Sequence, residues 1–123
     1  MRALARARSA LGARFRLHGR DPADGLDCVG LVGFAWQVAV PGGYAMRSAP
    51  HERIAAELTR AGFRPCAPDR PGAVVLGAPG PGQLHLAIAS GAGVVHADAL
   101  LRRVVERDAP LPWPVLAAWI CED

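Results

Sequence analysis

The pattern of apolar and polar positions divides the chain into a helical first half and a strand-rich second half. Helical spacing of apolar residues covers residues 2–14, 28–40 and 50–61. In the second half, short apolar runs bounded by Gly and Pro predict five strands, at 73–77, 84–90, 93–97, 102–107 and 115–121. Helices followed by hairpin-connected strands favour an α+β domain, with N-terminal helices packed on a C-terminal antiparallel sheet.

Turn-forming residues set the boundaries between these elements. Residues 15–27 are rich in Gly, Asp and Pro and are expected to form a loop. Residues 41–43, Pro-Gly-Gly, should end the central helix, and residues 78–83 should form a second loop directly before His85. Gly91-Ala92 predicts a tight hairpin between the second and third strands.

Composition bounds what such a domain can do. The 123 residues suit a single domain, 1–123, and 51% of them are apolar, which is enough for one core. The net charge is only +3, all 14 basic residues are scattered arginines, and one tyrosine and three phenylalanines offer no stacking platform. We therefore expect no nucleic-acid partner.

Targeting and redox signals are also weak. No stretch approaches the roughly 20 apolar residues of a membrane span. Arginines interrupt the first 15 residues too often for the apolar segment of a secretory signal, so we expect synthesis in the cytoplasm. The three cysteines, Cys28, Cys66 and Cys121, are too few and odd in number for a disulfide framework.

The sharpest chemical signal is a cysteine at the start of the central helix, in the stretch Gly25-Leu26-Asp27-Cys28. The first turn of a helix carries unpaired N–H groups that favour negative charge. We expect Cys28 to lose its proton more readily there, and a thiolate is the nucleophilic form. Its own backbone N–H is a candidate donor to an oxyanion.

Two histidines on neighbouring strands supply the rest of a nucleophilic site. His85 should point away from Leu84, Leu86 and Ile88, toward the face on which the central helix would then have to lie. With the turn at Gly91-Ala92, His96 should stand opposite His85, where it can fix the tautomer of that ring. The prediction is a relay from Cys28 to His85 to His96.

These segments resemble the NlpC-type cell-wall cysteine endopeptidases, whose pattern contains Gly-x-Asp-Cys-Ser-Gly-Leu followed by His-x-Gly-Ile and Ile-His-Ala. The matching stretches here are GLDCVGL, HLAI and VHA. The resemblance implies a papain-like fold and a Cys–His–His triad of Cys28, His85 and His96, with no cofactor or metal. It further implies hydrolysis of an amide bond in peptidoglycan stem peptides, next to D-glutamate. The small size resembles the phage-derived branch, which implies tail proteins as partners and assembly into a phage-like tail particle.

Departures from the pattern concern substrate contacts more than the nucleophile. Asp27 is retained and is expected to shape the substrate end of the site. Val29 replaces the serine that follows the catalytic cysteine, and Phe15 replaces an upstream tyrosine, so neither position can offer a hydroxyl.

Other functions use the same residues. An amidase or acyltransferase would need the same Cys–His site, and an inactive tail-tip binding or structural protein would be consistent with Val29 and Phe15. Zinc could in principle bind Cys28, His85, His96 and His18, although no closely spaced ligand pair is present. Trp113 and Trp119 are expected to be packing residues.

Overall fold

The computed structural model describes residues 2–39 and 50–121. Its helices are α1 (Ala3–Ser9), α2 (Cys28–Trp36) and α3 (His51–Arg60). Its strands are β1 (Arg20–Asp21), β2 (Gly25–Leu26), β3 (Arg64–Pro65), β4 (Val74–Gly80), β5 (Gln83–Ala89), β6 (Gly93–Asp98), β7 (Arg103–Asp108) and β8 (Val115–Ile120).

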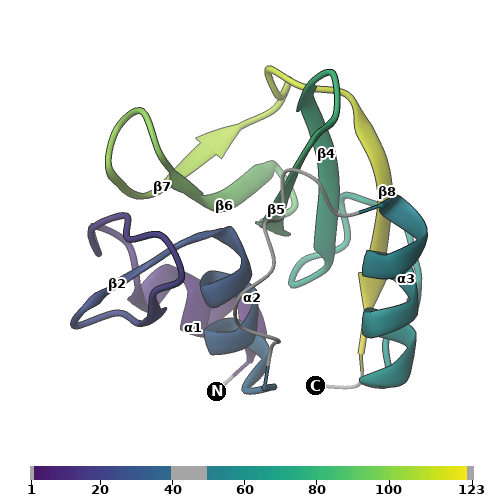
Figure 1. Ribbon diagram of the computed structural model, residues 1–123, viewed down its shortest axis with the longest axis horizontal. Coiled ribbons are helices and arrows are strands. Elements are labelled where there is room, and N and C mark those ends of the chain that lie inside the picture. Colours follow the sequence, from purple (N-terminus) through teal and green to yellow (C-terminus); the bar gives the residue numbers. More distant parts are fainter. Residues whose placement is uncertain (1, 40–49, 122–123) are drawn as a thin grey trace.

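Six of the strands form one antiparallel sheet in the order β3-β8-β4-β5-β6-β7, while β1 and β2 form a separate hairpin. Figure 1 shows α1 and α2 beside the β5–β6 part of this sheet and α3 along β8. The five predicted strands are all present. The sixth, β3, has only two residues and lies at the edge next to β8, so it leaves no alternating pattern in the sequence.

The core lies between the helices and one face of the sheet. Leu26 and Leu31 meet Leu76, Ile88 and Val95 there, and all five side chains are fully buried. Burial of this apolar surface supplies most of the stabilisation of such a layer, at roughly 25 cal/mol per Å². The chain is therefore an α+β domain with the predicted layers.

The first two helices end earlier than their sequence pattern predicts. Helix α1 stops at Ser9 rather than residue 14, and Gly12 then adopts a left-handed φ of +88°. Helix α2 stops at Trp36 rather than residue 40, with Gln37 left-handed at φ +55°. The predicted stop at residues 41–43 lies outside the described residues. Helix α3 matches its prediction closely.

The two predicted loops also contain strand. Residues 15–27 form β1, β2 and a bridge between Phe15 and Leu26, because backbone pairing satisfies polar groups that are buried under α2. Residues 78–83 are not a six-residue loop: β4 continues to Gly80 past a register shift, and β5 begins at Gln83.

Two glycines bring the 15–27 segment close to the start of α2. A Cβ added at Gly30 would overlap the carbonyl oxygen of Gly19, and a Cβ added at Gly19 would overlap the carbonyl oxygen of Gly25. The segment and the helix are thus in backbone contact, which no larger side chain would permit.

Candidate active site

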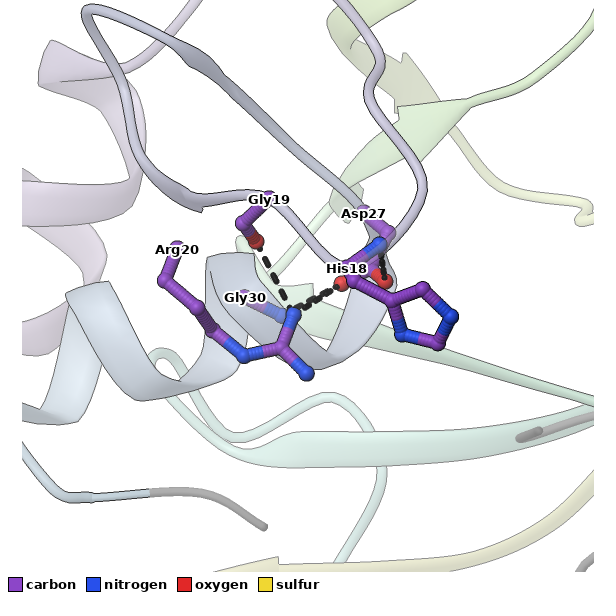
Figure 2. A network of polar contacts seen from close by, with 5 residues as sticks. All are labelled: His18, Gly19, Arg20, Asp27 and Gly30. Carbon is purple, nitrogen blue, oxygen red and sulfur yellow. Dashed lines mark hydrogen bonds and ion pairs between the residues drawn. The ribbon is translucent and has the colours of Figure 1, made fainter. Parts of the chain in front are cut away.

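The start of α2 is fixed by a buried carboxylate. Asp27 is the N-cap, and its Oδ1 accepts the N–H of Gly30 at 2.8 Å, which satisfies one unpaired donor of the first turn. The same oxygen forms an ion pair with Arg20 at 2.9 Å, while Oδ2 accepts the backbone N–H of His18 at 2.8 Å (Figure 2). The guanidinium of Arg20 also donates to the Gly19 carbonyl. Asp27 therefore ties the preceding segment to the helix that carries Cys28.

The other two predicted substrate-contact positions, Val29 and Phe15, both contribute to the apolar core. Val29 is only 8% exposed and contributes to the apolar core. Phe15 is partly buried against the same core, and its backbone N–H bonds to Arg102. Substrate contact by Asp27, Val29 and Phe15 stays a prediction. The structure adds that Asp27 positions the start of α2 through its hydrogen bonds and ion pair.

The sulfur of Cys28 lies against the backbone of β5. Backbone hydrogen bonds from Leu86, Val29 and Cys28 itself act on the thiol and lower its pKa, so N–H groups point at the sulfur. Val29 and Cys28 occupy the first helical turn, where N–H groups have no intrahelical partner. Leu86 follows His85 directly in β5, so the sulfur contacts the residue next to the predicted base.

The end of the β5–β6 ladder explains why Leu86 has a free N–H. Ala89 exchanges hydrogen bonds with the β4 side, so by alternation the N–H of Leu86 faces β6. The β5–β6 register covers only Ile88 with Val95 and Ala89 with Val94. Leu86 lies beyond these pairs, and Cys28 takes the place of a strand partner.

The pKa of Cys28 runs against the sequence-based expectation. Burial, the largest cause, and the neighbouring Asp27 carboxylate together raise this pKa from 9.0 to about 11. The N–H groups at the helix start act in the expected direction but are outweighed. Cys28 at neutral pH is therefore a thiol, and the prediction of an easily formed thiolate is wrong for the free protein.

The two predicted histidines are joined directly. Nε2 of His85 and Nδ1 of His96 lie 3.0 Å apart, and the ring planes are at 86°. The expected register is wrong, however: continuing the observed ladder places Ala87, not His85, opposite His96. The contact is diagonal, which long side chains on the same face can span.

The position of the central helix also differs from the prediction. The histidines do share the face opposite Leu86 and Ile88, but α2 packs on the Leu86 face. Cys28 therefore approaches β5 at the open end of its ladder rather than over the ring of His85. Within the described chain, no hydrogen bond joins Cys28 to His85, and Nδ1 of His85 has no hydrogen bond.

Trp113, which precedes β8, covers the histidine pair. Its ring centroid lies 5.0 Å from that of His85 and 5.2 Å from that of His96, both edge-on. The indole lies against Gly77, where any Cβ would overlap it. Burial, the largest cause, and the neighbouring His96 lower the pKa of His85 to about 4, so its imidazole is neutral at pH 7. Trp113 packs as expected, but at the site rather than in the core.

The sequence reasoning missed Asp98, which lies 3.9 Å from His96 through Oδ2 and Nε2. The period of two along a strand could have found it, because Asp98 follows His96 on the same face.

Among the described residues, no group of three His, Cys, Asp or Glu side chains is arranged to hold a metal ion. In that same part of the chain, no helix is long and apolar enough to cross a membrane.

Comparisons with known proteins establish the fold. No model of a known protein family matches the chain, and no curated protein matches it either. Among solved structures, the chain is similar to the NlpC/p60 domain of the peptidoglycan hydrolase SagA, with a TM-score of 0.64 and 23% identity. The match covers 94% of this chain and 93% of that one. The fold is therefore the papain-like α+β fold of NlpC/p60 domains.

Proposed function

We propose that this protein is a cysteine peptidase that hydrolyses an amide bond in peptidoglycan stem peptides. The observation that carries the proposal is the hydrogen-bonded pair of His85 on β5 and His96 on β6, next to Leu86, whose backbone N–H bonds to the Cys28 sulfur. A nucleophile at a helix start, a base beside it and a third group holding the base are the parts of a nucleophilic site. The fold shared with a peptidoglycan hydrolase domain supports the substrate class.

The mechanism begins from a neutral pair, because the pKa of Cys28 is about 11 and that of His85 about 4. In the proposed first step, Nδ1 of His85 removes the thiol proton while sulfur attacks the carbonyl carbon. The N–H of Cys28 donates to the developing oxyanion. The imidazolium then protonates the leaving amine, which leaves a thioester. Water, deprotonated by His85, hydrolyses that thioester and restores the thiol.

The finer parts of the proposal follow the sequence resemblance. We place the scissile bond next to D-glutamate and the protein's action at a phage-like tail, with tail proteins as partners. The resemblance of the chain in size to the phage-derived branch of these enzymes is what supports this placement. Immunodetection of the chain in purified tail particles from producing cells tests it, and its absence from assembled particles would contradict it.

The experiment that tests the enzyme proposal is digestion of purified stem peptides and intact peptidoglycan, followed by mass spectrometry of the products. Cys28→Ala should abolish cleavage while the circular dichroism spectrum is unchanged. Cys66→Ala, a matched change at a partly exposed cysteine outside the site, should cleave at the normal rate. Full turnover by Cys28→Ala would overturn the mechanism. An amidase or acyltransferase would use the same residues but would give different products.

One observation favours a second function, that of an inactive binding protein. Within the described residues the thiol and His85 share no hydrogen bond, and the thiol resists ionisation. Such a protein would retain peptidoglycan in a pull-down but release no fragments, and Cys28→Ala would bind equally well. Fragment release by the wild type decides in favour of the enzyme.

A further inference from the structure

The carboxylate of Asp98 is held in one orientation at the end of β6. Its Oδ1 accepts the backbone N–H groups of Leu100 at 2.8 Å and Leu101 at 3.0 Å. This turn occupies one oxygen and leaves Oδ2 directed at His96, 3.9 Å from Nε2. The side chain of Asp98 is 16% exposed and that of His96 is 3% exposed, so little water screens the pair.

Nε2 of His96 is a polar atom whose hydrogen-bonding capacity is not satisfied within the described residues. It is buried and has no hydrogen-bond partner in the described chain, whereas Nδ1 of the same ring is taken by His85. The distance to Asp98 exceeds that of a direct hydrogen bond, and such contacts in active sites often tighten when substrate binds. A carboxylate can only accept, so it favours a proton on the nitrogen that faces it.

We propose that Asp98 is a positioning residue that sets the tautomers of both histidines. With its proton on Nε2 facing Asp98, His96 presents Nδ1 as an acceptor. His85 must then donate Nε2–H to it, which leaves Nδ1 of His85 with a lone pair. The proposal rests on the role of His85 as the base for Cys28, because only that lone pair can accept the thiol proton.

The local charges agree with this assignment. Burial lowers the pKa of both imidazoles, and the negative charge of Asp98 acts against that effect on both. The other charged group that acts on His96 is Arg107, on the adjacent strand, whose guanidinium lowers the pKa of His96 further. Asp98 is thus the group that favours a proton on this pair.

Two substitutions separate this role from a merely structural one. In Asp98→Asn the amide oxygen can still accept from Leu100 and Leu101, so the amide N–H₂ faces His96 as a donor. The chain of hydrogen bonds should then reverse, moving the proton of each ring to Nδ1 and blocking His85 as a base. Asp98→Ala removes both the turn contact and the charge but imposes no tautomer. If Asp98 only supports the turn, Asp98→Ala should be the less active variant. If Asp98 controls the tautomers, Asp98→Asn should be the less active variant.

The test is ¹⁵N NMR of the imidazole nitrogens in the full chain, with peptidase kinetics alongside. We expect Nε2–H on both rings in the wild type, Nδ1–H on both in Asp98→Asn, and a mixture in Asp98→Ala. We expect kcat/KM to fall about 10-fold in Asp98→Ala and about 100-fold in Asp98→Asn. Asp108→Asn, the same change at the far end of β7, should leave tautomers and rate unchanged.

The two proposals fail in different ways. Retention of Nε2–H on both rings in Asp98→Asn, or a rate higher than that of Asp98→Ala, would overturn the role of Asp98. If the tautomers reverse as expected while Cys28→Ala still hydrolyses peptidoglycan, the proposed mechanism falls and the control of tautomers by Asp98 stands.

Discussion

His85 and His96 are hydrogen-bonded across a diagonal of the sheet, with Nε2 and Nδ1 3.0 Å apart. Their ring planes are almost perpendicular, at 86°. Each ring therefore meets the other through a ring nitrogen rather than a face. The second nitrogen of His96 faces Asp98, and the second nitrogen of His85 has no hydrogen bond within the described residues.

Burial of the thiol predicts slow alkylation of Cys28 at neutral pH. With a pKa of about 11, Cys28 should react with iodoacetamide roughly a hundred-fold more slowly than free cysteine at pH 7, and its rate should rise until about pH 11. Peptide mapping by mass spectrometry resolves Cys28 from Cys66 and Cys121 in one sample. Rapid labelling of Cys28 at pH 6, lost in His85→Ala, would instead indicate a preformed thiolate–imidazolium pair.

Burial of a neutral imidazole predicts that acid destabilises the fold. The pKa of His85 is about 4 in the folded chain and 6.5 ordinarily, so the unfolded state binds more protons between these values. Stability should be fully present above pH 6.5 and should fall by about 3 kcal/mol as pH drops to 4. Urea unfolding across this range measures the loss.

The control for acid sensitivity is a pair of histidine variants. His85→Gln should show a flatter pH dependence of unfolding free energy between pH 6.5 and 4. His18→Asn, at an exposed left-handed position that asparagine tolerates, should keep the wild-type dependence. Equal slopes in all three proteins would place the acid sensitivity elsewhere.

The Asp27 network predicts a structural cost at the start of α2. Asp27→Ala removes the cap on Gly30, the bond to the His18 N–H and the Arg20 ion pair, so we expect a loss of about 2 kcal/mol of unfolding free energy. Asp24→Ala, an exposed change in the same segment, should cost less than about 0.5 kcal/mol. Chemical denaturation of both variants measures the difference, and equal stabilities would show that the network contributes nothing.

The packing of Trp113 over the histidine pair predicts that removing the indole changes the pKa of His85. Trp113→Ala exposes His85 and His96 to water, so the pKa of His85 should rise from about 4 toward its ordinary value. Trp113→Phe keeps an aromatic ring over the pair and should raise the pKa of His85 less. NMR titration of the imidazole protons reads both values directly. An unchanged pKa in Trp113→Ala would show that other residues exclude the water.

The layers and the histidine pair could be predicted because they depend on local pattern. Alternation along residues 84–90 and 93–97 gives the strands and puts His85 and His96 on one face whatever the exact pairing. The register could not be predicted, because a shift of two residues keeps every side chain on its face. Sequence alone therefore identifies the pair of residues but not its diagonal geometry.

The chemistry of Cys28 was the least predictable part. Its place at a helix start follows from the sequence, and that place does supply N–H groups to the sulfur. The opposing effect is burial of the thiol against the core, to which strands far along the chain contribute. Long-range burial of this kind has no local signal, and neither does the packing of Trp113 against Gly77.

The backbone contact between Gly19 and Gly30 limits how this protein can change. A methyl group at Gly30 would push the 15–27 segment away from α2, and one at Gly19 would force that segment to rearrange internally. A random substitution at either site would therefore alter the surroundings of Cys28 while leaving every proposed reacting group in place. In a mutational library selected for cell-wall cleavage, substitutions at Gly19 and Gly30 should be recovered as rarely as substitutions at Cys28.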